Sequence, residues 1–237
     1  MSEWWTYALS DLLMFSARTY FRQFALLNEA VWPAHLLALV AGLALVGAIL
    51  RGAGKAGRLA AGVLAASWLW VAWAYHAQRY ADINLAAPYF AIGFALQAVL
   101  LAWLATRRRA PAIPSWQSPL GALAFAIVLL SLLLYPLFAA FDGRDWTQAE
   151  VFAIAPDPTV AATLGMLLLW RAPWFLWLLP LLWCALSGAT LMELGVGQAW
   201  VLPLAGLLAL AAAIVARLRL RMDDRAGTRV RVADPTG

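Results

Sequence analysis

The stretch Ala155-Pro156-Asp157-Pro158-Thr159 decides how the apolar run behind it can fold. That run, residues 160–170, is shorter than the ~20 residues that a membrane-spanning helix needs. Two prolines two residues apart interrupt a regular helix, so we expect a short helix that begins at Pro158 with Asp157 as its N-cap. Irregular backbone at membrane depth is tolerated only against protein or a wet cavity. We therefore expect this turn to floor a pocket, the alternative being a helix that begins near Glu150 and kinks.

The composition is that of an integral membrane protein. Hydrophobic residues make up 65% of the 237 residues, charged residues make up 12%, and the mean hydropathy is +0.78. Soluble domains carry roughly 25% charged residues, so the lipid bilayer is the expected partner. The single cysteine, Cys184, excludes an internal disulfide and metal sites built on cysteine clusters. The net charge of +5 does not indicate nucleic-acid binding, because the arginines lie at the ends of apolar runs and in the tail.

Apolar runs separated by short connections predict an all-α fold, a bundle of seven transmembrane helices. The runs lie near residues 30–50, 58–77, 85–106, 117–140, 158–170, 173–193 and 199–218. The residues before them alternate aromatic with charged side chains, which predicts an amphipathic helix lying in the membrane interface. The expected organisation is an interfacial segment at 1–28, a bundle at 29–221 and a disordered cytoplasmic tail at 222–237.

The Lys and Arg residues predict the orientation of the bundle. Cytoplasmic loops carry an excess of these residues, and placing the loop at 51–58 inside puts thirteen of the 17 on one side. The inside set is Arg51, Lys55, Arg58, Arg107, Arg108, Arg109, Arg171, Arg217, Arg219, Arg221, Arg225, Arg229 and Arg231. The outside set is Arg18, Arg22, Arg79 and Arg144. This division predicts an outside N-terminus and an inside C-terminus.

Several spaced motifs resemble one protein family. They are Asn28-x3-Trp32-Pro33, His76-x6-Ile83-Asn84-x-Ala86-Ala87, Phe90-x3-Phe94-x2-Gln97, Pro156-x-Pro158-Thr159-x5-Gly165 and Pro180-x2-Trp183-x4-Gly188. Together they resemble the bacterial domain-of-unknown-function family 6064 over most of residues 1–216. The resemblance implies a multi-pass protein of the bacterial inner membrane and assigns it no reaction.

The candidate site lies among polar residues that the predicted topology gathers in the outer third of the bundle. The ligand-binding candidates are His76, Arg79, Tyr80, Asn84, Asp157, Thr159 and His35. The two histidines have several interpretations: ligands of a haem, copper or zinc, donors to a quinol, or interfacial side chains with wet tips. Asn84 is the expected N-cap of the helix that follows it. The loop from His76 to Asn84 is either a surface turn closed by an Arg79–Asp82 ion pair or a lid over the turn at 155–159.

Three functions follow from this arrangement. The leading one is a permease-like protein for a small solute or ion, with an outward-facing pocket above Asp157. The second is a non-transporting subunit that docks a redox or periplasmic partner, and the third is a membrane enzyme that uses His76 with a carboxylate. We assign no catalytic residues, because no soluble-type catalytic motif is present. We predict no cofactor: the one lysine, Lys55, lies in a loop, which excludes retinal, and a single cysteine cannot hold an iron–sulfur cluster.

Overall fold

The computed structural model describes residues 14–51, 55–107 and 117–233, and every regular element in these ranges is helical. The predicted all-α class is therefore confirmed. The helices are α2 (Ala17–Val31), α3 (Ala34–Leu50), α4 (Ala56–Trp70), α5 (Ala87–Thr106), α6 (Pro119–Leu129), α7 (Phe138–Phe141), α8 (Pro156–Leu169), α9 (Leu178–Glu193) and α10 (Val201–Ala233). Short π and 3-10 turns extend α4 through Val71–Ala77 and join α6 to α7.

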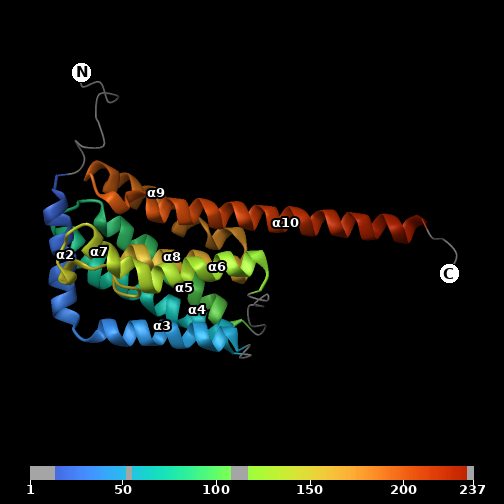
Figure 1. Cartoon of the computed structure of the whole chain (residues 1–237), viewed down its shortest axis with the longest axis horizontal. Helices are drawn as coiled ribbons and strands as arrows, with labels where there is room; N and C mark the ends of the chain where they lie inside the picture. The colour runs from blue at the N-terminus through green and yellow to red at the C-terminus, as the bar shows by residue number, and fades with distance from the viewer. Residues whose placement is uncertain (1–13, 52–54, 108–116, 234–237) are drawn as a thin grey trace, which may run out of the picture.

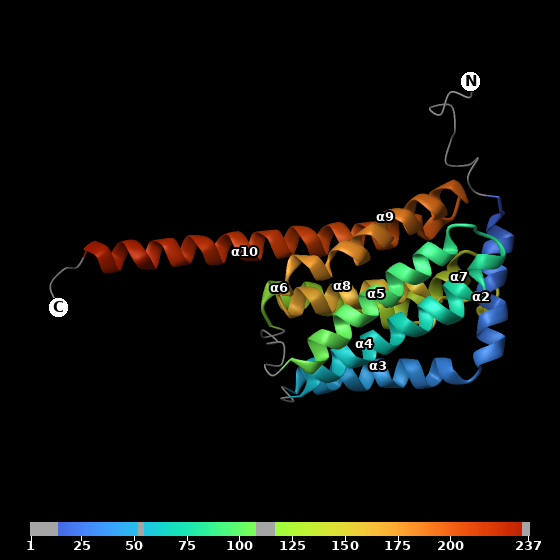
Figure 2. The same ribbon diagram turned by 180° about the vertical axis from the view of Figure 1, so that it is seen from behind.

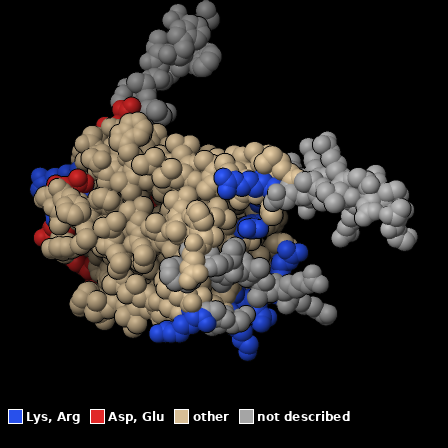
Figure 3. All heavy atoms as spheres, turned by 45° about the vertical axis from the view of Figure 1, so that its right-hand side comes forward, with Lys and Arg blue, Asp and Glu red and all other residues tan. Residues whose placement is uncertain are grey.

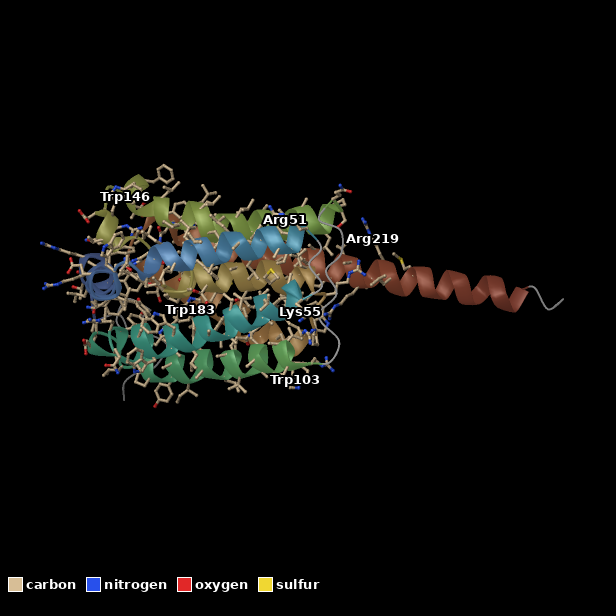
Figure 4. The ribbon with its side chains drawn as sticks, turned by 90° about the horizontal axis from the view of Figure 1, so that it is seen from below. Arg51, Lys55, Trp103, Trp146, Trp183 and Arg219 are labelled. Atoms are coloured by element: carbon tan, nitrogen blue, oxygen red, sulfur yellow. The ribbon has the colours of Figure 1, made fainter. Side chains whose placement is uncertain are left out.

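Most helices run roughly parallel or antiparallel to one another, and α2 lies across one end of them (Figures 1 and 2). The axis changes direction by 89° between α2 and α3, at Trp32-Pro33. We call this end of the bundle the α2 end. The opposite end, which carries Arg51, Lys55 and Arg219, is the basic end (Figures 3 and 4).

Five helical segments are long and apolar enough to cross a membrane, and the bent pair α2–α3 raises the number to six if it counts as one span. The chain is therefore a multi-span membrane protein. The predicted count of seven is not reached by length and composition, because α8 has only 14 residues. At ~1.5 Å per residue this helix is about 21 Å long, against a hydrocarbon core of ~30 Å.

The central helix of the bundle is α8. It packs against α4, α6, α9 and α10, and each of its residues from Pro156 to Leu169 is buried. Close packing against α6 depends on Gly165, where an added Cβ would lie 2.7 Å from the carbonyl oxygen of Ala124. A helix enclosed in this way can begin and end inside the protein without exposing its backbone to lipid.

The terminal segments differ in extent from the predicted ones. The described part of the interfacial segment forms α2, which ends at Val31 rather than at residue 28; residues 1–13 of the prediction lie outside the described ranges. Ser16 caps α2, accepting a hydrogen bond from the Thr19 amide at 3.3 Å. At the other terminus, α10 continues to Ala233, through most of the predicted tail at 222–237. Extending a formed helix by one residue is far easier than nucleating one, so no helix end falls at residue 222.

Candidate functional site

The turn before α8 begins the helix without using Asp157 as a cap. The helix starts at Pro156, and Ala155 occupies the N-cap position with no side-chain hydrogen bond. The predicted start at Pro158 and the predicted capping by Asp157 are therefore wrong, because proline is well suited to the first helical position. Thr159 holds this turn: its Oγ1 donates to the Ala155 carbonyl at 2.7 Å and accepts from the Ala153 amide at 3.1 Å.

Asp157 faces the interior of the bundle and is fully buried. Its Oδ1 accepts a hydrogen bond from the indole Nε1 of Trp183 at 2.8 Å, and its Oδ2 accepts one from the Ser187 hydroxyl at 2.6 Å. Both donors belong to α9, where residues four apart lie on one face. The carboxyl group is thus held by two neutral donors, and it forms no salt bridge with any described residue.

His76 lies beside this group in a box of aromatic rings. The side chain is fully buried at the end of the π-helical turn Val71–Ala77. Its ring centroid is 4.4 Å from that of Phe94 and 4.9 Å from that of Trp183. Neither ring nitrogen has a hydrogen-bond partner among the described residues. Trp183, drawn in Figure 4, therefore contacts His76 with its ring while its N–H is donated to Asp157.

The loop after His76 divides between the interior and the surface. Tyr80 is buried and stacks on Tyr75, with ring centroids 5.4 Å apart. Arg79 is partly exposed and forms no ion pair with Asp82, so the predicted surface pair is wrong. The N-cap of α5 is Ala86, and the predicted N-cap Asn84 lies two residues before it. The Oδ1 of Asn84 accepts a hydrogen bond from the Ala86 amide at 2.8 Å.

His35 lies in a different place from the other candidates. Its Nε2 is 3.0 Å from Oδ1 of Asn28, and its ring is 5.9 Å from that of Trp32. These contacts are at the corner between α2 and α3, whereas the contacts of His76 are with α5 and α9. The structure does not bring the two histidines together, which removes the basis for a ligand that they share.

A second polar group surrounds Glu150, in the segment before α8. Glu150 accepts a hydrogen bond from the side-chain amide of Gln198, which in turn accepts one from Arg144 at 2.8 Å. Arg144 also pairs with Asp142 at 3.2 Å and lies 3.7 Å above the ring of Phe21. Burial, and secondarily the negative charge of Asp157, raises the pKa of Glu150 to about 8.

A cavity of about 470 Å³ opens beside this second group at the α2 end. Its lining comes from three parts of the chain: Ala17, Arg18, Phe21, Asp142, Gly143, Arg144, Asp145, Gln148, Leu194, Gly195, Val196 and Gly197. Asp157 and His76 do not line it. Of the residues around Glu150, Arg144 lines this cavity and accounts for its link to the second polar group through Gln198.

Sequence reasoning missed the partners that hold the site. Trp183 and Ser187 supply the donors to Asp157. Polar residues in otherwise apolar spans were the available signal, because lipid-facing positions disfavour them. Within the described ranges, no group of three or more His, Cys, Asp or Glu is placed to hold a metal ion.

Comparisons with known proteins identify the chain only at the level of a family. Neither the curated proteins nor the solved structures contain a match to it. Residues 17–224 match a family described as "Family of unknown function (DUF6064)". This range includes both polar groups and all the candidate membrane spans. By this match over most of its length, the chain belongs to the DUF6064 family.

Proposed function

We propose that this protein is permease-like and binds a proton or a small cation at Asp157. The proton or cation enters from the α2 end. The supporting observation is the pairing of Asp157, whose buried carboxyl group has Trp183 and Ser187 as donors and no basic partner in the part of the chain that the structure describes. An ionisable residue inside a membrane bundle is expensive and is generally functional. A carboxylate held by neutral groups keeps its affinity for a cation, which a salt bridge would neutralise.

The unpaired ring nitrogens of His76 support the proposal that water or an ion enters and leaves this site. Leaving a buried polar atom without a partner costs about 1–3 kcal/mol. His76 has two such atoms beside Trp183, the residue that also holds Asp157. A water molecule or hydrated ion that enters between these groups would satisfy the ring nitrogens. The enzyme hypothesis has less support, because it requires a carboxylate within hydrogen-bond reach of His76.

The proposed route begins at the cavity beside Arg144. From there Gln198 and Glu150 form a continuous hydrogen-bonded chain toward α8. Glu150 has one buried oxygen, Oε2, without a partner in the described chain, where a proton or ion that has passed Arg144 and Gln198 would bind. Asp157 follows seven residues later, and its charge acts on Glu150.

In the proposed topology all seven segments cross the bacterial inner membrane, with the α2 end outside and the basic end in the cytoplasm. The excess of Lys and Arg at the basic end supports this orientation (Figure 3). α8 counts as the fifth span because the surrounding helices enclose it. Apolar side chains of α8, including Leu164 and Leu167, fill the bundle below Asp157. Passage to the cytoplasm therefore requires α8 to move.

Ion flux into proteoliposomes tests the proposal. Vesicles that hold a pH-sensitive dye, or in a second arm a sodium-sensitive dye, receive a potassium diffusion potential, negative inside, through valinomycin. We expect wild-type protein to carry protons or sodium faster than empty vesicles, and Asp157→Asn to reduce this flux at least tenfold. Asp82→Asn is the matched control, since Asp82 is an exposed acid that does not line the cavity.

The outcomes separate cleanly. Flux equal to that of empty vesicles in both arms would overturn transport of these ions and favour the non-transporting subunit. Flux that Asp157→Asn leaves unchanged would show that ions cross elsewhere. The same purified variants are compared by size-exclusion profile, so that loss of flux through misfolding is recognised.

A further inference from the structure

A second cavity, of about 530 Å³, lies at the corner between α2 and α3, and it is separate from the site at Asp157. It is lined by Asn28, Glu29, Trp32, His35, Pro136, Trp146, Thr147, Ala149 and Val151. Glu29 is the one residue in this lining that carries a formal charge at neutral pH. Trp32 and Trp146 are 66% and 61% exposed, although both are large apolar side chains. Figure 4 places Trp146 at the α2 end.

The hydrogen bonds of Asn28 fix the chemistry that His35 offers. The Nδ2 amide of Asn28 donates to two carbonyl oxygens, those of Thr147 at 2.7 Å and Ala149 at 2.8 Å. Its Oδ1 is therefore the acceptor that meets His35, at 3.0 Å from Nε2. The imidazole must carry its proton on Nε2, and in a neutral ring this leaves Nδ1 as an acceptor. Nδ1 is buried and has no partner in the described chain.

The lining of the cavity thus includes a carboxylate, two aromatic side chains and His35, whose buried Nδ1 is an unpaired acceptor in the described chain. Aromatic rings with a nearby carboxylate are the groups that bind ammonium ions, through cation–π attraction and charge. The unpaired Nδ1 of His35 adds a requirement that the ligand bring an N–H or O–H donor. A primary ammonium satisfies all three features, whereas a quaternary ammonium has no donor for Nδ1 and an anion is repelled by Glu29.

The surroundings of the cavity indicate where the rest of the ligand lies. Exposed tryptophans are typical of the membrane interface, at the level of lipid headgroups. On α3, the exposed apolar side chains of Leu36, Leu37 and Val40 continue from His35 toward the basic end. A hydrocarbon chain that leaves the cavity would lie along them.

We propose that this cavity binds the primary ammonium headgroup of a membrane lipid, held by Glu29, His35 and the two tryptophans, with the acyl chains along α3. The ligand class is a phospholipid with an ethanolamine-type headgroup. The inference is independent of the transport site, because it uses none of its residues.

Native mass spectrometry of the full-length protein in detergent tests it with three lipids that have identical acyl chains. We expect wild-type protein to retain phosphatidylethanolamine most, phosphatidylcholine less and phosphatidylglycerol least, with steps of roughly fivefold for interactions of ~1 kcal/mol. Glu29→Gln should lower retention of both ammonium lipids. His35→Phe should lower phosphatidylethanolamine to the level of phosphatidylcholine and leave phosphatidylcholine unchanged, because only the primary ammonium donates to Nδ1.

Matched controls lie at the same end of the bundle. Trp200→Leu removes a tryptophan that is 67% exposed and outside the cavity, and Glu193→Gln removes an exposed carboxylate there. Both should keep the wild-type order of lipids, whereas Trp32→Leu should weaken both ammonium lipids. Free ethanolamine is added as a competitor: displacement of the lipid would identify a soluble amine as an occupant, and no displacement would identify the lipid. Equal retention of all three lipids by wild-type protein would overturn the proposal.

Discussion

The helices α3 and α8 have similar lengths, 17 and 14 residues, and opposite environments. In α3 only Gly42 and Ile49 are buried, and large side chains such as Leu37 are exposed. In α8 every residue is buried. His35 is the one side chain of α3 that carries a polar group, whereas α8 contains Asp157 and two threonines. The more polar helix is thus the one enclosed by protein.

This difference shows how a membrane changes the meaning of an apolar sequence. Lipid is as apolar as leucine, so an apolar side chain gains little by leaving lipid for the protein interior. Polar side chains gain much more, because hydrogen-bond partners exist only inside the bundle. Hydropathy alone therefore locates helices without telling which of them is central.

The largest expected effect comes from a close contact of the buried helix. A Cβ at Gly165 would lie 2.7 Å from the Ala124 carbonyl, whereas one at Gly47 of α3 would meet only the end of the Arg51 side chain, at 3.2 Å. Gly165→Leu should destabilise the protein by about 3 kcal/mol through overpacking against backbone, or prevent folding. Gly47→Leu should be neutral or stabilising by up to ~1 kcal/mol, because leucine has the better helix propensity.

Thermal unfolding of purified protein, followed by fluorescence-detected size exclusion, measures both variants. Equal melting temperatures for Gly165→Leu and Gly47→Leu would contradict the assignment of α8 as the tightly packed helix. In that case α8 would differ from α3 only in its polar residues.

A second expected effect is the loss of the acceptor in α8. Asp157→Leu leaves the Trp183 indole N–H and the Ser187 hydroxyl without an acceptor, at a cost of about 2 kcal/mol in the free energy of unfolding. Asp157→Asn should cost less, since its Oδ1 can still accept from Trp183. His35→Leu in α3 removes one hydrogen bond and should cost ~1 kcal/mol. Chemical unfolding in detergent ranks the three; a milder Asp157→Leu than His35→Leu would contradict the ranking.

The free energy of unfolding should also depend on pH, because the carboxyl group of Glu150 is buried. Its pKa is raised from 4.5 to about 8, first by burial, so the folded protein keeps a proton that the unfolded chain loses. The stabilisation is complete below pH 4.5 and is lost as the pH rises through about 8. We expect the free energy of unfolding, and with it the melting temperature, to fall between pH 5 and 8, by roughly 1–4 kcal/mol at ~1.4 kcal/mol per pKa unit, and Glu150→Gln to flatten this slope.

An exposed acid provides the control for that pH dependence. The backbone and side chain of Thr147 lower the pKa of Asp145, whose stabilisation is therefore lost only as the pH falls into the acid range. Asp145→Asn should leave the slope between pH 5 and 8 unchanged. If the melting temperature of Glu150→Gln still falls between pH 5 and 8, a group other than Glu150 binds the proton.

The sequence predicted a short helix after the proline pair, because the apolar run at 160–170 is too short to span a membrane, and α8 is indeed short. It did not predict that α8 is the central helix of the bundle. The partners of Asp157 could not be predicted, because Trp183 and Ser187 are 26 and 30 residues away and apolar periodicity does not give the rotation of α9 in a membrane. Only the neighbouring helices fix that rotation.

An interfacial helix at 1–28 followed by a spanning run at 30–50 predicts a change of direction, and the axis does change by 89° between α2 and α3. The side-chain contacts at this corner could not be predicted, because an apolar pattern does not give the rotation of either helix. That change brings Asn28 to His35 and separates His35 from His76. The two cavities follow from tertiary packing in the same way, and sequence reasoning could expect a pocket without locating its opening.

The smallest expected effect tests the lipid-facing side of the comparison. Leu37 in α3 is 71% exposed, and Leu164 in α8 is fully buried. Leu37→Ala should cost less than ~0.5 kcal/mol, because lipid fills the space it leaves, whereas Leu164→Ala leaves a cavity and should cost about 2 kcal/mol, the lower end for a buried leucine. Melting temperatures in the same detergent measure the two variants. If Leu37→Ala loses nearly as much stability as Leu164→Ala, then protein and not lipid covers α3. If the mass of the Leu37→Ala protein in detergent also falls to that of a monomer, the covering protein is a second copy of this chain.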